Sequence, residues 1–241
     1  MTRPLTGMAL AAGLGTRLRP ITDSIPKPLV RLGGRTLLDH AIDRLEAAGV
    51  ETVIVNTHYR GDQIAAHLAK RSHPRIILSE EADLLETGGG VRNALPLLGE
   101  HFYVVNSDVV WLDGKVPALE RLARAWDEAE MDAILLLQRT TTAIGYEGLG
   151  DYFLDPLGMP RRRREREIGP YIFAGVQILH RRLFDGLQSM PAKFSLNRLY
   201  DRAHEAGRLR GIVHDGEWYH IGTPAGLALA EERFAIRRVE R

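Results

Sequence analysis

A chain of 241 residues is long enough to bury a substantial core as one large α/β domain or two small ones. The formal net charge of +1 excludes the strongly basic surface typical of nucleic-acid binding, and the absence of cysteine excludes disulfides, thiolate catalysis and thiolate metal sites. The sequence contains no apolar run of ~20 residues that could span a membrane, and its N-terminus lacks the apolar core of a signal peptide. We therefore expect a cytoplasmic protein that binds neither nucleic acid nor a membrane.

The stretch MALAAGLGTRLRPITDSIPKPL, near the N-terminus, predicts an anion-binding site. Its apolar start, residues 8–12, predicts a buried strand, and Gly13 and Gly15 follow in a turn. Glycines after a strand allow bare backbone N–H groups to approach an anion, and cations such as Arg17 and Lys27 then neutralise phosphate charge. The pattern therefore predicts a triphosphate-binding loop at the carboxyl end of the first strand.

Two common glycine-rich motifs do not match this stretch. The dinucleotide fingerprint needs a third glycine where Leu18 stands, and the P-loop needs a Gly-Lys-Ser/Thr sequence that is absent. A Gly-x-Gly pair alone is also typical of an ordinary tight turn between a strand and a helix, so the remaining sequence has to separate these interpretations.

Strand and helix patterns alternate along the chain. Strands are predicted over residues 29–32, 50–56, 76–79, 102–108, 133–138, 171–179 and 209–214, and helices over residues 37–48, 62–70, 91–98 and 116–130. This alternation favours a Rossmann-like, mostly parallel sheet with helices on both faces and ligands beyond the carboxyl ends of the strands. Glycines and prolines over residues 145–160 predict hairpins that form a small antiparallel flap over the substrate.

Several long motifs resemble the sugar-nucleotidyltransferases, also called nucleoside-diphosphate-sugar pyrophosphorylases. They are Ala-Ala-Gly-Leu-Gly-Thr-Arg-Leu at 11–18, Pro-Lys-Pro-Leu at 26–29, Leu-Glu-Thr-x-Gly-Gly at 85–90, Val-Val-Asn-x-Asp at 104–108, Gly-Asp-Tyr-Phe at 150–153, Phe-Ser-Leu-Asn at 194–197 and Trp-x-x-Ile-Gly-Thr-Pro at 218–224. The resemblance therefore covers nearly the whole chain. Its details are most similar to the short bacterial N-acetylmuramate-1-phosphate uridylyltransferases of cell-wall recycling, and the short mannose-1-phosphate guanylyltransferases are also similar.

The resemblance implies one nucleotidyltransferase domain over residues 1–241, with a nucleotide-binding half (1–115) and a sugar-phosphate-binding half (116–241), as a monomer or homodimer. The implied reaction joins a nucleoside triphosphate, with UTP favoured, to a sugar 1-phosphate, with N-acetylmuramate 1-phosphate favoured, and releases pyrophosphate. GTP with mannose 1-phosphate is the alternative substrate pair. The alternative from another class is a nucleotide- or sugar-binding regulator whose active site has decayed.

The resemblance also implies roles for particular residues. The catalytic residues would be Arg17, Lys27 and Asp108, and Asp108 would bind Mg²⁺, with Mn²⁺ as the other candidate. The nucleotide would contact Leu10, Ala11, Ala12, Gly13, Gly15, Thr16, Glu81, Gly88 and Asn106, and the sugar phosphate would contact Gly150, Gly175 and Asn197. A carboxylate only accepts hydrogen bonds, so Glu81 would favour the ring N–H of uracil or guanine over adenine and cytosine.

Two departures from the family pattern leave alternatives open. His220 stands where relatives have a second metal-binding aspartate, and histidine is a poor ligand for Mg²⁺. Either Asp108, phosphates and water suffice for Mg²⁺, or the metal differs, or activity is weakened or lost. The family's Glu-Lys-Pro lysine is also absent, and an arginine of residues 161–166 or Lys193 could replace it, unless this run is only a solvated hairpin. His58 fits either a locally bonded rim residue or a substrate contact.

Overall fold

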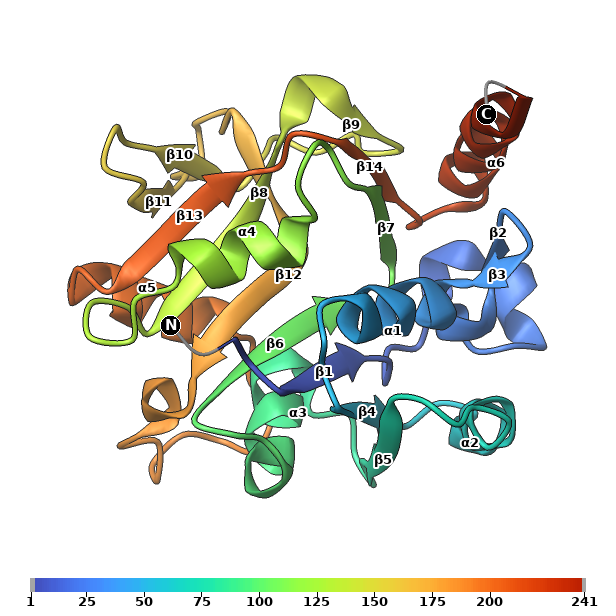
Figure 1. The fold of residues 1–241 in the computed structure, drawn as a ribbon, viewed down its shortest axis with the longest axis horizontal. Helices are drawn as coiled ribbons and strands as arrows, with labels where there is room; N and C mark the ends of the chain where they lie inside the picture. The colour runs from blue at the N-terminus through green and yellow to red at the C-terminus, as the bar shows by residue number, and fades with distance from the viewer. Residues whose placement is uncertain (1–2, 240–241) are drawn as a thin grey trace.

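The computed structural model describes residues 3–239, and within them nine strands form one twisted sheet across the molecule (Figure 1). The centre of this sheet is parallel. Strand β1 (Thr6–Leu10) lies between β4 (Thr52–Thr57) and β6 (His101–Asn106), and β5 (Arg75–Glu80) extends the sheet beyond β4. The carboxyl ends of these strands therefore meet at one edge, where a ligand is expected in such sheets.

The antiparallel strand β12 (Tyr171–His180) joins this centre to the second half of the chain. One side of β12 pairs with β6, and the other pairs with β8 (Ala133–Arg139), which is parallel to β13 (Leu209–Val213). The start of β12 pairs with β10 (Tyr152–Leu154), which forms an antiparallel hairpin with β11 (Pro160–Arg162). The predicted α/β fold, with parallel strands and an antiparallel hairpin, is confirmed.

Helices cover both faces of the sheet because alternate strand residues point to opposite sides. On one face, Ala9 and Val55 pack with α1 (Leu37–Ala47), α2 (Gly61–Leu68) and α4 (Ala118–Ala125). On the other, Met8 and Ile54 pack in the same apolar cluster as residues of α3 (Glu86–Ala94) and α5 (Asn197–Glu205). Thr36 is the N-cap of helix α1, and its Oγ1 accepts a hydrogen bond from the N–H of Asp39 at 3.0 Å.

Two small sheets and a C-terminal helix complete the fold. Their elements are β2 (Arg31–Leu32), β3 (Arg35–Thr36), β7 (Val109–Leu112), β9 (Ala143–Ile144), β14 (Glu217–His220) and α6 (Pro224–Val239). Strand β14 lies between β7 and β9. The motif at residues 218–224 therefore lies beside β7, the strand that follows β6 in the chain (Figure 1). None of the described helices has the length and apolarity that crossing a membrane requires.

Of the predicted boundaries that were wrong, three have a clear physical cause. The glycines at 88–90 lie inside α3 rather than before it, because the missing side chains let the helix pack closely: a Cβ on Gly88 would lie 2.4 Å from the ring of Phe194. Helix α4 ends at Ala125 instead of residue 130, because Trp126 is extended and buries its ring. The strand predicted at 29–32 begins only at Arg31, because Lys27–Leu29 form a 3₁₀ turn.

Candidate active site

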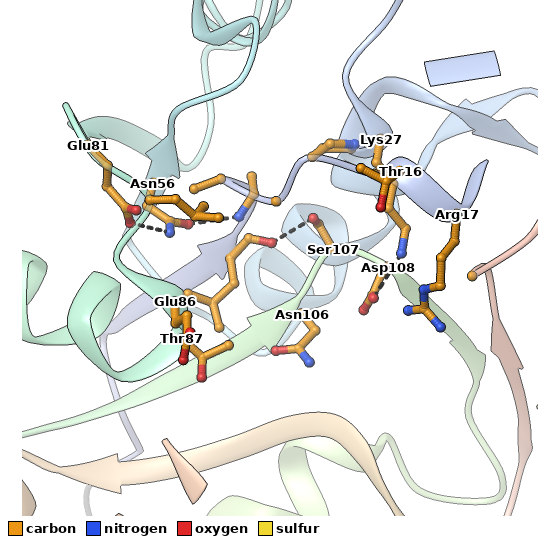
Figure 2. Close-up of a pocket in the computed structure, with 18 of the residues that line it drawn as sticks. Thr16, Arg17, Lys27, Asn56, Glu81, Glu86, Thr87, Asn106, Ser107 and Asp108 are labelled. Carbon is orange, nitrogen blue, oxygen red and sulfur yellow. Dashed lines mark hydrogen bonds and ion pairs between the residues drawn. The ribbon is translucent and has the colours of Figure 1, made fainter. Parts of the chain in front are cut away.

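A cavity of about 410 Å³ opens at the carboxyl ends of β1, β4 and β6 (Figure 2). It brings together most of the predicted nucleotide-side and catalytic residues: Leu10, Ala11, Ala12, Gly13, Gly15, Thr16, Arg17, Lys27, Glu81, Asn106 and Asp108. Residues that were not predicted also line it, namely Pro28, Asn56, Leu84, Glu86, Thr87, Ser107, Ser195 and Gly222. The fold therefore gathers segments from residue 10 to residue 222 around one space.

The loop after β1 presents unpaired backbone donors to this cavity. Among residues 3–239, no internal acceptor is hydrogen-bonded to the N–H groups of residues 13–16. The turn depends on Gly15, which has a φ of +65° and whose Cβ, if present, would lie 2.9 Å from the Cβ of Lys27. Thr22 holds the turn by donating its hydroxyl to the carbonyl of Gly15 at 2.8 Å. Adjacent free N–H groups in such a turn form an anion-binding concavity.

Lys27 and Asp108 form an ion pair inside the cavity, with 2.9 Å between Nζ and Oδ2. Burial raises the pKa of Asp108, but the Lys27 charge and hydrogen bond, together with the charges of His220 and Arg17, outweigh burial and lower it overall. The carboxylate is therefore ionised at neutral pH.

Arg17 is the second cation of the cavity. Its side chain is exposed, and none of the described residues forms a hydrogen bond or ion pair with it. The guanidinium therefore remains available for a ligand, and phosphate oxygens match its fork of donors.

At the other end of the cavity, Glu81 and Asn56 form a buried network with the loop after β1. Asn56 donates to Oε1 of Glu81 at 2.7 Å and accepts from the N–H of Ala11 at 2.8 Å. The second oxygen of Glu81 accepts from the N–H of Leu85 at 3.0 Å. A Cβ on Gly90 would lie 2.7 Å from Oε1, so this glycine makes room for the carboxylate. Asn56 was missed in the sequence, where an asparagine ending the apolar run Val-Ile-Val was the available signal.

Two further hydroxyl groups tie the walls of the cavity together. Ser107 donates its hydroxyl to the carbonyl of Leu10 at 2.6 Å and so joins the ends of β1 and β6. Thr87 accepts from the N–H of Leu196 at 3.0 Å and joins the start of α3 to the segment before α5. Neither side chain was predicted to line the site, although both lie within the recognised motifs.

The remaining predicted site residues lie away from the lining of this cavity. Gly88 is inside α3, where its N–H donates to the carbonyl of Phe194. Asn197 lines a second cavity, of about 380 Å³, beside the β10–β11 hairpin. Gly150 is not in this lining, but its neighbour Asp151 is. Gly175 lies close to the first cavity, because a Cβ on it would lie 3.1 Å from the Cβ of Asn106.

The structure also shows the contacts of the side chains for which the sequence left two roles open. The ring Nδ1 of His58 is 2.9 Å from the carbonyl oxygen of Glu81, which matches the locally bonded rim residue. Arg161 pairs with Glu167 and Arg162 with Asp201. Side-chain nitrogens of Arg163 donate to the backbone carbonyls of Gly150, Arg164, Glu165 and Glu167, and Lys193 is exposed. None of these cations lines the first cavity.

His220 lies beside the cavity rather than in its lining. Its ring stacks on Trp218 with 6.0 Å between centroids and an interplanar angle of 12°. Burial lowers the pKa of His220, and the charges of Lys27 and Arg17 lower it further, while Asp108 opposes them. The imidazole is therefore neutral at neutral pH.

The described residues contain no cluster of three or more histidine, aspartate or glutamate side chains that could hold a metal. Of the three carboxylates that line the cavity, Asp108 is the one that pairs with Lys27, and its Oδ1 carries no hydrogen bond from the described residues. A single carboxylate completed by substrate phosphates and water fits the coordination of Mg²⁺.

Nucleotide-binding proteins commonly combine a parallel sheet centre with a loop of free backbone donors after the first strand, and this chain has both features. A family model described as the MobA-like NTP transferase domain matches residues 7–208, and the chain belongs to this family. The chain is 43% identical over 238 residues to the N-acetylmuramate alpha-1-phosphate uridylyltransferase of Caulobacter vibrioides, covering 96% of this chain and 98% of that relative. It is 38% identical over 228 residues to the mannose-1-phosphate guanyltransferase of Aspergillus fumigatus, covering 91% of this chain and 61% of that relative.

Solved structures of sugar nucleotidyltransferases share the fold. A UDP-glucose pyrophosphorylase complexed with UDP-glucose superposes with a TM-score of 0.80 at 17% identity, covering 99% of this chain and 100% of that chain. A putative glucose-1-phosphate thymidylyltransferase from Bacillus anthracis gives 0.79 at 18% identity, covering 95% and 94%. The predicted family and fold are thus both confirmed.

Proposed function

We propose that the protein transfers a nucleotidyl group from UTP to N-acetylmuramate 1-phosphate, giving the UDP-sugar and pyrophosphate. The observation that carries this proposal is the Lys27–Asp108 ion pair, which lies in the same cavity as Arg17 and the free N–H groups of residues 13–16. The identity of 43% to a uridylyltransferase over nearly the whole of both chains supports the same reaction.

The proposed mechanism relies on positioning and charge neutralisation. The N–H groups of residues 13–16 and Arg17 hold the β- and γ-phosphates, and Lys27 stabilises charge on the α-phosphate during transfer. An oxygen of the sugar phosphate attacks the α-phosphorus in line, a new P–O bond forms, and the bond to the β-phosphate oxygen breaks. Because the attacking oxygen is already anionic, the reaction needs no general base.

We propose Mg²⁺ as the metal, with Asp108 as its protein ligand and Mn²⁺ as a substitute. When bound, the metal would neutralise phosphate charge next to Lys27. The ring of His220 stacks on Trp218, and in its neutral form it would donate a hydrogen bond to phosphate or to a metal-bound water rather than bind the metal itself.

The two halves of the chain would divide the substrates. The nucleotide would lie against residues 10–16, Glu81 and Asn106, and Glu81 would accept the ring N–H of the base through lone pairs left by its two internal hydrogen bonds. The sugar phosphate would lie toward Gly150, Gly175 and Asn197 in the second half, residues 116–241. Because its substrate is a nucleoside triphosphate, we place the enzyme in the cytoplasm.

GTP with mannose 1-phosphate remains the second candidate pair, because the chain is 38% identical to a mannose-1-phosphate guanyltransferase. Guanine presents the same kind of ring N–H donor as uracil, so Glu81 would serve either base.

Pyrophosphate release decides between these substrates. The purified enzyme is incubated with Mg²⁺ and each pairing of UTP, GTP, CTP or ATP with N-acetylmuramate 1-phosphate or mannose 1-phosphate. We expect the highest kcat/KM with UTP and N-acetylmuramate 1-phosphate. Highest activity with GTP and mannose 1-phosphate would select the second candidate, and no release with any pair would contradict both.

A further inference from the structure

Glu86 has an unusual backbone at the edge of the cavity. It is the first residue of α3 and has a φ of +60°, in the left-handed region. A residue with a Cβ adopts this conformation at a cost that glycine avoids, and such residues are concentrated at functional sites. Favourable interaction of an acidic side chain with the helix N-terminus needs only ordinary helical angles, so it does not explain this conformation.

The side chain of Glu86 lines the cavity and is exposed. Within the part of the chain that the structure describes, it forms no hydrogen bond or ion pair. Glu81 differs in both respects: it is 6% exposed, and each of its oxygens accepts an internal hydrogen bond. Of these two carboxylates, Glu86 is therefore the one whose full set of acceptors is left for a ligand.

The position of Glu86 relative to the cations indicates which part of a ligand it meets. Figure 2 shows Glu86 and Glu81 at one end of the cavity, and Arg17 and Lys27 at the other. A carboxylate repels phosphate and accepts hydrogen bonds from hydroxyl and N–H groups. The phosphates of a bound nucleotide would therefore lie at the cationic end, and its neutral donor groups would lie near Glu86.

We propose that Glu86 is a specificity-determining residue that accepts hydrogen bonds from hydroxyl or N–H donors of a substrate, and that its left-handed backbone aims the carboxylate at them. This inference rests on the proposed function. The donors belong either to the nucleoside of the triphosphate or to the sugar of the sugar 1-phosphate.

The test uses calorimetry, which measures binding without turnover, on wild type, Glu86→Gln, Glu86→Ala and Glu86→Gly. One arm titrates UTP with Mg²⁺. The other titrates N-acetylmuramate 1-phosphate in the presence of a UTP analogue with a methylene bridge between the α- and β-phosphorus atoms. Glu80→Gln is the matched control, because Glu80 is a nearby exposed carboxylate outside the cavity lining.

We expect Glu86→Ala and Glu86→Gly to weaken Kd for one of the two ligands by ~10- to 100-fold, the scale of a hydrogen bond to a charged group, with Glu86→Gln between them and wild type. The ligand whose Kd changes is the substrate that donates hydrogen bonds to Glu86. Glu86→Gly should also raise Tm by ~2–4 °C, because glycine relieves the backbone strain, whereas Glu86→Ala should not.

Two results would overturn the proposal: affinities within twofold of wild type in both arms, or a lower Tm for Glu86→Gly. Unchanged affinities in an enzyme that releases pyrophosphate would reject only the role of Glu86. A wild type that binds UTP but releases no pyrophosphate with any pair would reject the proposed function. The Kd values of the variants would still measure how much Glu86 contributes to binding.

Discussion

The cavity at the ends of β1 and β6 and the surface around the β10–β11 hairpin both carry cations, but these cations differ in their hydrogen-bond partners. In the cavity, Arg17 and the N–H groups of residues 13–16 have no partner among the described residues. Around the hairpin, Arg161 and Arg162 pair with carboxylates and Arg163 donates to backbone carbonyls. The comparison indicates that the density of positive charge along the sequence does not reveal which polar groups remain without partners inside a cavity.

The largest expected effect comes from Lys27. Replacing it with alanine removes the ammonium group next to Asp108, so turnover should fall by at least ~10²-fold, the scale of losing one preorganised charge. Steady-state pyrophosphate release measures this loss, and circular dichroism checks the fold. Lys70→Ala is the control, because Lys70 is an exposed lysine outside the cavity lining. Near-native turnover in a folded Lys27→Ala variant would remove Lys27 from the mechanism. The cations of the cavity would then matter no more for activity than those of the hairpin.

The second prediction concerns Glu81 at the opposite end of the cavity. Wild type should prefer UTP or GTP over ATP and CTP, and Glu81→Gln should relax this preference by ~10-fold, because the amide keeps one acceptor but adds a donor. The measurement is kcat/KM for all four triphosphates. A wild type that uses ATP as well as UTP would contradict the assignment of Glu81 to the base.

The third prediction concerns His220, which lies beside the cavity. Since its ring stacks on Trp218 outside the cavity lining, Mg²⁺ should support the wild type, and His220→Asp should lower the Mg²⁺ concentration for half-activation several-fold by adding a second carboxylate. Activation curves with Mg²⁺ and Mn²⁺ test this. A wild type that is inactive with Mg²⁺ and active with Mn²⁺ would instead make His220 a metal ligand.

The smallest catalytic effect is expected at the hairpin. Arg163→Ala removes donors to backbone carbonyls, so it should lower Tm by a few degrees and leave kcat/KM within ~2-fold of wild type. Arg164→Ala is the matched control, since among residues 3–239 only its backbone is hydrogen-bonded. If Arg163→Ala raised KM for the sugar 1-phosphate tenfold or more at unchanged Tm, Arg163 would take the role of the Glu-Lys-Pro lysine that this chain lacks. The hairpin cations would then bind substrate, as the cavity cations are proposed to do.

The sequence predicted the cationic end of the cavity well, because its signals are local. Gly15, Arg17 and Lys27 lie within one short segment, and the turn that joins them follows from glycine at positive φ. Asp108 was predicted from the resemblance of residues 104–108 to a family motif, and the structure places it in the cavity lining. The strands themselves were predicted from continuous apolar runs.

The sequence could not predict contacts that depend on packing between distant segments. Asn56 and Ser107 line the cavity only because β1, β4 and β6 end side by side. The sequence predicted that the glycines at 88–90 precede a helix beginning at residue 91, but they are buried inside α3, which packs against the segment around Phe194. The left-handed backbone of Glu86 has no sequence signal, because glutamate normally avoids it.

The central claim, that this cavity transfers a nucleotidyl group, is tested most directly by following labelled phosphorus. The enzyme is given N-acetylmuramate 1-phosphate, Mg²⁺ and UTP labelled with ³²P at either the α- or the γ-position. Nucleotidyl transfer predicts that the α-label enters the UDP-sugar and the γ-label enters pyrophosphate, and that both signals fall together in Lys27→Ala. Transfer of the γ-label to the sugar, or its release as inorganic phosphate by the enzyme alone, would contradict the account.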